Sequence, residues 1–163
     1  MPRFEMLDKQ EKALWLPSLF DVLYENMKMI VSGEETYEQQ RACWLAEVSG
    51  ALEKAPRQIV LCFSNGELAG FVQYYTRENL LMVEEVQLKA AYQRTMMFGC
   101  LCRFMVSVLP PQIAFVEAYA ETSNLHSRRM MERLGMEYIH DETPPRFVHL
   151  RGDAKRIKRM LRI

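Results

Sequence analysis

The segment from residue 80 to residue 109 constrains the fold of this chain more than any other part of it. Residues 80–89 are rich in Val, Leu and Met, a composition that predicts a β-strand. From about Arg94 onward, apolar residues recur at the spacing of an α-helix: Met97, Leu101, Met105 and Val108. A strand that leads directly into a helix leaves backbone N–H groups pointing out of the connection, and these groups suit an anion, above all a phosphate.

The residues before this segment predict two helices followed by the first strands of a sheet. Thr36 and Gln39 have the spacing of a capping box at the start of the second helix. Asn65 and Gly66 both tolerate the positive φ of a type I′ turn, and they therefore predict a β-hairpin. The expected elements are a short edge strand at 1–7, helices at 17–31 and from 36 to about 56, and strands at 57–64 and 67–76.

The residues after it predict a buried strand, a helix, two short strands and a basic tail. Pro110 and Pro111 end the preceding helix, and a right-handed crossover makes the next strand parallel to the strand at 80–89. Gly135 suits the C-terminal cap of the helix that follows. The expected elements are a strand at 113–120, a helix at 123–134, strands at 136–139 and 146–150, and an amphipathic helix at 153–163. This order predicts a mixed α/β fold with helices on both faces of one sheet.

Composition and charge limit the classes of protein to which the chain can belong. With 163 residues, 49% of them apolar, it has material for one core, and we expect a single domain over residues 1–163. Lys plus Arg equals Asp plus Glu at 21 each, so no global field indicates nucleic acid. The apolar runs are too short to span a bilayer, and no secretory signal opens the chain. We therefore expect a cytoplasmic protein that binds neither membrane nor nucleic acid.

Neither the cysteines nor the histidines predict a metal site. No pair of cysteines has metal-ligand spacing backed by histidines, so we expect buried, reduced thiols and no metal. The histidines do not cluster, and each is expected to be a surface residue or a satisfied core residue. The residues concerned are Cys43, Cys62, Cys100, Cys102, His126, His140 and His149.

Two short motifs resemble the GNAT superfamily of N-acetyltransferases. In that family an Asn follows the fifth strand, a small residue comes three positions later, and the next helix ends in Lys/Arg-Leu-Gly-Phe. Asn124 and Ser127 fit the start of this pattern, and residues 133–135 fit its end, with Met136 at the usual Phe. Residues 88–94 are similar to the family's stretch Val-x-Pro-x-Tyr-Arg/Gln, which leads into its pyrophosphate loop.

The resemblance implies a GNAT-like fold: a mixed, mostly antiparallel sheet with helices on both faces and a central parallel strand pair. It also implies an N-acetyltransferase that moves an acetyl group from acetyl-CoA to a primary amine by direct attack. The acceptor would be a small-molecule or peptide amine, and a homodimer is compatible with the family. The positions that match the family's cofactor contacts are Val86, Leu88, Gln93, Arg94, Thr95, Met96, Met97, Phe98, Gly99, Asn124 and Ser127.

Three further positions depart from the family pattern. Met96 and Phe98 stand where the family has glycines, which let backbone amides approach a pyrophosphate closely. Their side chains either crowd the phosphates or turn inward and leave the N–H groups exposed. Met131 stands where the family often has a Tyr that protonates the leaving thiolate, and a thioether cannot donate a proton. The candidate replacement acids are Tyr92, Tyr119 and Tyr138, and spacing favours none of them.

Two adjacent carboxylates, Glu84 and Glu85, lie in the strand at 80–89, and acetyl transfer requires a base for the amine. By alternation, Glu84 shares a side of the strand with Leu88, where the resemblance implies backbone pairing with the pantetheine, and Glu85 faces the other way. We therefore predict Glu84 as the general base, acting directly or through water. Alternatively, the two carboxylates form a solvated strand end or bind charge on the substrate.

Other functions remain open from the sequence. A non-catalytic module with the GNAT fold, which binds a ligand or partner and has weak or lost CoA binding, is favoured by Met96, Phe98 and Met131. The basic tail either forms a solvated helix face or provides a handle for RNA or a membrane. Its basic residues are Lys155, Arg156, Lys158, Arg159 and Arg162.

Overall fold

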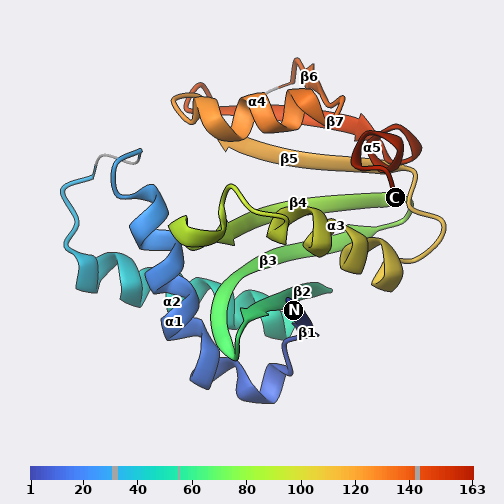
Figure 1. Cartoon of the computed structure of the whole chain (residues 1–163). Coiled ribbons are helices and arrows are strands. Elements are labelled where there is room, and N and C mark those ends of the chain that lie inside the picture. The colour runs from blue at the N-terminus through green and yellow to red at the C-terminus, as the bar shows by residue number, and fades with distance from the viewer. Residues whose placement is uncertain (31–32, 55, 142–143) are drawn as a thin grey trace. The chain divides into compact units, whose positions relative to one another are not determined.

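The computed structural model describes residues 1–30, 33–54, 56–141 and 144–163. Its strands form a seven-stranded sheet in the order β1-β2-β3-β4-β5-β7-β6 (Figure 1). β4 and β5 are parallel and central, with residues 80–83 paired to residues 115–118. The pairs β1–β2, β5–β7 and β6–β7 are antiparallel. The predicted mixed, mostly antiparallel sheet with a central parallel pair is therefore confirmed.

The strands lie close to their predicted positions. They are β1 (Arg3–Met6), β2 (Arg57–Ser64), β3 (Glu67–Arg77), β4 (Leu80–Leu88), β5 (Phe115–Glu121), β6 (Glu137–Ile139) and β7 (Phe147–Asp153). Asn65 and Gly66 take φ values of 51° and 83° between β2 and β3, and the hairpin prediction is confirmed. β1 is an edge strand, as the sequence predicts.

The chain divides into two compact units. Unit 1 comprises Met1–Gln73 and Glu85–Phe98, and unit 2 comprises Tyr74–Glu84 and Gly99–Ile163. β3 and β4 each contribute residues to both units. The expectation of a single domain stays a prediction.

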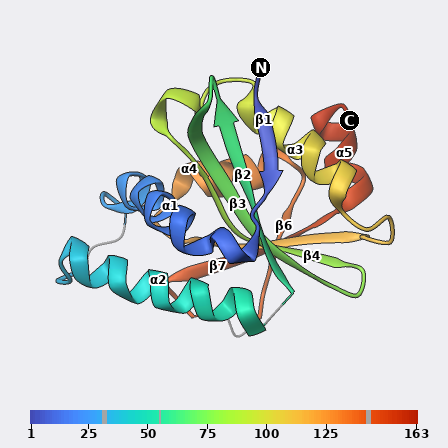
Figure 2. The same ribbon diagram turned by 90° about the horizontal axis from the view of Figure 1, so that it is seen from below.

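Unit 1 builds its core between two helices and the first strands of the sheet. α1 (Lys12–Met27) and α2 (Tyr37–Lys54) lie side by side (Figure 2). Leu19, Leu52, Ile59 and Phe71 are almost completely buried in the apolar cluster of this unit. Full burial of such a side chain contributes about 1.5–3 kcal/mol, so these residues supply much of the stability of unit 1.

α1 differs from its prediction at both ends. It begins at Lys12, directly after the 3₁₀ turn η1 (Lys9–Glu11), and Pro17 lies inside the helix. Pro is favoured in the first turn of a helix, which is why the sequence predicts a start at Pro17. This start is wrong, because burial of Leu16 and Leu19 extends the helix to the N-terminal side of Pro17. The helix ends at Met27, and the predicted end at Val31 lies outside the described residues.

The capping box at the start of α2 is confirmed. The Thr36 N–H donates to Gln39 Oε1 at 2.8 Å, and the Gln39 N–H donates to Thr36 Oγ1 at 3.2 Å. These two bonds satisfy donors that the first turn of a helix otherwise leaves unpaired.

Unit 2 covers one face of β5 and β7 with two helices, α4 (Leu125–Arg133) and α5 (Ala154–Leu161) (Figure 1). Gly135 has a φ of 80° just beyond α4, which confirms it as the C-terminal cap. Asp153 caps α5 by accepting the N–H of Arg156 at 2.7 Å. The buried cluster between strands and helices contains Ala118, Ala120, Met131, Met136, Leu150 and Ile157.

α3 (Met97–Val108) begins three residues later than predicted. A 3₁₀ turn, η2 (Ala90–Tyr92), separates it from β4. Met97, Leu101 and Met105 are buried as expected, but Val108 is 39% exposed. The prediction for Val108 is wrong because this residue ends the helix just before Pro110 and Pro111, where the last turn is no longer covered. Among the described residues, no helix combines the length and the hydropathy that crossing a membrane requires.

Candidate active site

A network of side-chain amides fixes the end of β4 in unit 1. Asn26 Nδ2, on α1, donates to Gln87 Oε1 and to the Leu88 carbonyl, both at 2.9 Å. Gln93 Nε2 donates to Asn26 Oδ1 at 2.9 Å and to the same carbonyl at 3.0 Å. Gln87 Nε2 also donates to Glu85 Oε2 at 2.8 Å. The network thus joins Leu88 and Gln93, two predicted cofactor contacts, and it occupies the Leu88 carbonyl with two donors from the protein.

Sequence reasoning missed Asn26 and Gln87. Asn26 contacts residues that lie more than sixty positions away in the chain, and no spacing rule links positions so far apart. The available signal was a polar residue in the last turn of an otherwise apolar helix face. The sequence alone does not show which residue of the strand this side chain contacts.

β3 approaches β4 closely at Gly70. A Cβ atom at this position would lie 2.1 Å from the Gln87 carbonyl oxygen and 2.8 Å from the Leu88 Cα. Only glycine allows two backbones to come this close. Gly70 therefore sets the position of the strand end that carries the predicted contacts Val86 and Leu88.

The first turn of α3 is ordered by a side chain at its start and leaves open space beside Gly99. Thr95 Oγ1 accepts the Met97 N–H at 3.2 Å and donates to the Tyr92 carbonyl at 2.9 Å, which orders the chain as it enters the helix. A Cβ atom built on Gly99 would meet no atom within 4 Å. The N–H groups of Phe98 and Gly99 belong to the first helical turn, which has no intrahelical acceptors for them, so this position suits an anion.

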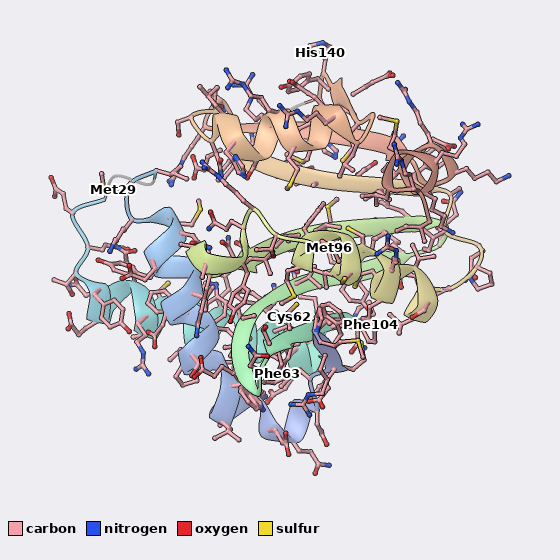
Figure 3. All side chains as sticks on the ribbon, viewed as in Figure 1. Met29, Cys62, Phe63, Met96, Phe104 and His140 are labelled. Carbon is pink, nitrogen blue, oxygen red and sulfur yellow. The ribbon has the colours of Figure 1, made fainter. Side chains whose placement is uncertain are left out.

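The sequence allows two orientations of the Met96 side chain: it either crowds the phosphates or turns inward. Met96 lies at the start of α3 with 79% of its surface exposed, whereas its neighbour Met97 is 4% exposed (Figure 3). The interpretation in which Met96 turns inward is therefore wrong, and Met97 supplies the inward side chain. Phe98 is half-buried, and Arg94 is exposed.

Glu84 comes directly after the last residue of β4 that pairs with β5. It is half-buried, as is Glu85, so the two carboxylates do not form a fully solvated strand end. Glu85 lies on the side of β4 that carries Gln87, to which it is hydrogen-bonded. The role of Glu84 as general base stays a prediction.

The start of α4 in unit 2 matches the family motif locally. Asn124 Oδ1 accepts the Ser127 N–H at 3.1 Å and is the N-cap of the helix. Cofactor contact by Asn124 and Ser127 stays a prediction. Arg128, one position further, donates to the Thr122 carbonyl at 2.8 Å. Met131 packs in the core of unit 2, so the position of the family's Tyr provides no proton donor.

A buried ionic cluster in unit 2 is the second feature that sequence reasoning missed. His149 Nε2 lies 3.0 Å from Glu117 Oε2, and His149 Nδ1 lies 2.6 Å from Asp141 Oδ2. Arg151 also pairs with Glu117. His149 is a satisfied core histidine, as one of the two alternatives predicts, while His126 and His140 are exposed. Glu117 alternates with apolar residues in β5 and therefore resembled an ordinary outward-facing strand position.

The cysteines are only partly as predicted. All four are free thiols, and Cys62 is buried as expected, whereas Cys100 and Cys102 are half-buried. Cys43 on α2 is exposed, so the expectation of burial is wrong for it. Burial raises the pKa of the Cys62 and Cys102 thiols to about 12. Within the part of the chain that the structure describes, no group of three or more His, Cys, Asp or Glu side chains is arranged to hold a metal ion.

Comparison with known proteins gives a clear result only at the level of structure. No family model matches the sequence, and no curated protein matches it. A crystal structure of an acetyltransferase from Thermus thermophilus superposes with a TM-score of 0.72 at 15% identity, covering 94% of this chain and 97% of that one. An acetyltransferase of the GNAT family from Staphylococcus aureus gives a TM-score of 0.67 at 10% identity, covering 94% and 99%. This chain has the GNAT fold.

A third structure with the GNAT fold contains ligands. The aminoglycoside acetyltransferase AAC(6')-Ib, in complex with coenzyme A and kanamycin, gives a TM-score of 0.65 at 16% identity, covering 98% of both chains. On the GNAT fold of the present chain, the predicted cofactor contacts fall into two local sets. One set, at 86–99, spans the end of β4 and the start of α3, and the other contains Asn124 and Ser127 at the start of α4.

Proposed function

We propose that this chain is an N-acetyltransferase that transfers an acetyl group from acetyl-CoA to the primary amine of a small molecule or peptide. The observation that carries the proposal is the start of α3, where a Cβ atom built on Gly99 would meet only open space and where the side chain of Met96 is exposed to solvent. The structures of the same fold that contain coenzyme A support acyl transfer as the class of reaction.

In the proposed enzyme, the N–H groups of Phe98 and Gly99 bind the pyrophosphate of acetyl-CoA, with Arg94 and Thr95 nearby in the chain. The backbone of β4 at Val86 and Leu88 pairs with the pantetheine arm through groups other than the Leu88 carbonyl, which accepts two protein donors already. The substrate amine attacks the thioester carbonyl carbon, and Glu84 accepts the proton that the nitrogen loses.

The sharpest test of the pyrophosphate site uses Met96→Glu. A negative charge in the first turn stabilises a helix by about 0.3–1 kcal/mol, but the same charge repels a bound pyrophosphate. We therefore expect thermal stability to stay constant or rise slightly, while calorimetry shows acetyl-CoA binding weakened about tenfold, the equivalent of about 1.4 kcal/mol. Opposite effects on stability and on affinity cannot come from unfolding.

Met160→Glu is the matched control, because Met160 is also exposed and the change in net charge is the same. It should leave the affinity for acetyl-CoA unaltered. Absence of binding by the wild-type protein at near-millimolar acetyl-CoA would favour the alternative of a non-catalytic module. Equal affinities of wild type and Met96→Glu would show that the pyrophosphate binds elsewhere.

The proposed base is tested by Glu84→Gln, which keeps the shape of the side chain and removes its basicity. With a panel of amines and detection of the released thiol, we expect a rate lower by about 10²-fold or more, with acetyl-CoA affinity little changed. Glu85→Gln should have a smaller effect. Turnover of Glu84→Gln at the wild-type rate across the pH range would show that the amine loses its proton to water instead.

A further inference from the structure

One face of β5 and β7 in unit 2 is turned away from α4 and α5 and carries charged and aromatic side chains. The cross-strand pairs Ala118–Leu150 and Ala120–Val148 point toward α4 and α5, where they pack in the apolar cluster. The alternating pairs, Glu117–Arg151 and Tyr119–His149, point to the opposite face. This face therefore holds the buried ionic cluster of unit 2 and three large, partly exposed aromatic residues, Phe115, Tyr119 and Phe147.

His149 fixes the ring of Tyr119. The two rings are stacked, with centroids 4.2 Å apart and planes inclined by 17°. The imidazole itself cannot turn without losing a contact, because Asp141 and Glu117 hold its two nitrogens from opposite sides. Because both of its nitrogens are held, the imidazole ring of His149 is rigid, and it restricts the orientation of the Tyr119 ring that stacks on it.

The hydroxyl of Tyr119 is available to a ligand. The residue is 46% exposed, and the described residues provide no hydrogen-bond partner for its hydroxyl. Partial burial, followed by the nearby carboxylates of Asp141 and Glu117 and by Tyr75, raises the pKa of the phenol above its ordinary value of 10.0. The group therefore stays protonated throughout the physiological range, and it can donate a hydrogen bond without ionising.

Tyr119 and the predicted base, Glu84, both follow the last pair of the parallel ladder between β4 and β5. Parallel pairing of β4 with β5 ends at Val83–Ala118, and the next step along the two strands is Glu84 and Tyr119. Both side chains alternate with that last pair, so both are expected on the face that carries Met82 and Glu117. The end of the parallel ladder thus combines a carboxylate that can accept a proton with a phenol that can donate a hydrogen bond.

We propose that Tyr119 is a catalytic residue whose hydroxyl donates a hydrogen bond to the leaving sulfur of the acetyl donor, and that His149 positions it. This inference rests on the proposed function. It assigns to β5 the task that the family often gives to a Tyr at the position of Met131, which is buried in the core here.

The chemistry balances without any additional reactant. The amine nitrogen forms a bond to the thioester carbonyl carbon, and the carbon–sulfur bond breaks with its electron pair moving to sulfur. Glu84 accepts the proton lost by nitrogen. The sulfur leaves as a thiolate stabilised by the Tyr119 hydroxyl, and it takes a proton from solvent. Because the phenol has a higher pKa than a thiol, whose ordinary value is about 8.5, Tyr119 keeps its own proton.

The other two candidate tyrosines fit this task less well. The Tyr138 hydroxyl accepts Arg128 Nε at 3.2 Å and donates to Glu132, so it is engaged at the edge of the sheet. Tyr92 closes the 3₁₀ turn that precedes α3, and its carbonyl accepts Thr95 Oγ1 there. Neither residue lies at the end of the parallel ladder.

The test measures the acidity of the thiol of bound CoA, which requires no acceptor and no turnover. In the wild-type complex, a hydrogen bond from Tyr119 should stabilise the thiolate, so the thiol should titrate about one to two pH units lower than in Tyr119→Phe, as followed by the ultraviolet absorbance of the thiolate. Tyr119→Phe keeps the stacked ring and removes only the hydroxyl. Its kcat should fall about 10- to 10²-fold, with the affinity for CoA unchanged.

Two further variants separate donation from positioning. His149→Ala should raise the pKa of the bound thiol by less than Tyr119→Phe does, a shift that mere loss of stability in a still-folded protein would not produce. Tyr138→Phe should leave that pKa at the wild-type value. A shift in Tyr138→Phe, or none in Tyr119→Phe while CoA still binds, would overturn this inference alone. Absence of CoA binding would overturn it together with the proposed function.

Discussion

Unit 1 and unit 2 bury different kinds of side chain. Unit 1 packs Leu19, Leu52, Ile59 and Phe71 under α1 and α2, and the buried polar residues among its described positions, Gln73 and Gln87, are uncharged. Unit 2 has a smaller apolar cluster and in addition buries Glu117 together with His149. Their charges differ as well: unit 1 contains nine basic and twelve acidic residues, and unit 2 twelve basic and nine acidic, so the neutral chain combines net charges of −3 and +3.

The difference shows what each kind of core can contribute. Apolar burial stabilises a fold in proportion to the area removed from water. A buried ionic cluster gains far less, because the desolvation of each charge offsets most of the attraction between the partners, and apolar replacements are often neutral or stabilising. The core of unit 1 is therefore explained by stability, whereas the cluster at His149 is better explained by the orientation it imposes on Tyr119.

The largest expected effect concerns the thiols, with one shielded reporter in each unit: Cys62, which is buried, and Cys102, which is half-buried. Because burial raises the pKa of Cys62 in unit 1 and of Cys102 in unit 2 to about 12, each has about 10³-fold less thiolate at neutral pH than a cysteine with a pKa near 8.5. Alkylation followed by peptide mass spectrometry should modify the exposed Cys43 first.

The same experiment in increasing denaturant tests whether the units unfold together. Simultaneous labelling of Cys62 and Cys102 at one midpoint would support the predicted single domain. Labelling of one thiol at a lower denaturant concentration would show that the two units are separate folding domains. Early labelling of either thiol in the native protein would contradict its burial.

The next effect is the loss of a core aromatic side chain in unit 1. Phe71 is fully buried and touches Trp44 edge-on, with ring centroids 6.3 Å apart. Phe71→Ala should lower the free energy of unfolding by about 3–5 kcal/mol, because it removes apolar contacts and leaves a cavity. Denaturant titration measures this change. Phe115→Ala, at an exposed position of β5, is the control and should cost much less.

Glu117→Gln in unit 2 should have a smaller effect on stability. The amide keeps the size of the side chain but pairs less well with His149 and Arg151, and we expect a loss of about 1–3 kcal/mol. A loss equal to that of Phe71→Ala would show that the ionic cluster is a main source of stability, and it would remove the contrast between the two units.

The smallest effects are expected at the helix caps, where the units should behave alike. Thr36→Ala in unit 1 and Asp153→Ala in unit 2 each remove one side-chain acceptor from a first-turn N–H. Each should cost about 1 kcal/mol in denaturant titration. A difference well above this value between the two variants would mean that one helix depends on its cap more than on packing.

Much of the fold was predictable because its signals are local. Asn65-Gly66, the Thr36–Gln39 capping box and Gly135 each act through the backbone of a few adjacent residues, and all three are confirmed. The strands at β2 and β4 were predicted to within one residue. Pro17 misled because tertiary burial carried the helix across a residue that usually starts one.

The candidate site was less predictable because its side chains meet through distant pairings. The sequence located the ends of β4 to within one residue and the starts of α3 and α4 to within three, but not the Asn26 amide that joins α1 to β4. They also gave no reason to choose among three tyrosines. The choice of Tyr119 needs the β5–β7 register, which brings it onto His149, and registers between strands far apart in sequence have no local signal.

The amide of Asn26 also has a consequence for the order of folding. Its partners Gln87, Leu88 and Gln93 follow it by 61 to 67 residues, so the last turn of α1 closes these bonds only after a long loop has been organised. Contacts of high sequence separation form slowly, because the chain must lose conformational entropy before these contacts form and stabilise the structure. In pulsed hydrogen exchange during refolding, the amides around Asn26 should gain protection later than those in the middle of α1, and Asn26→Ala should leave the early protection of that helix intact.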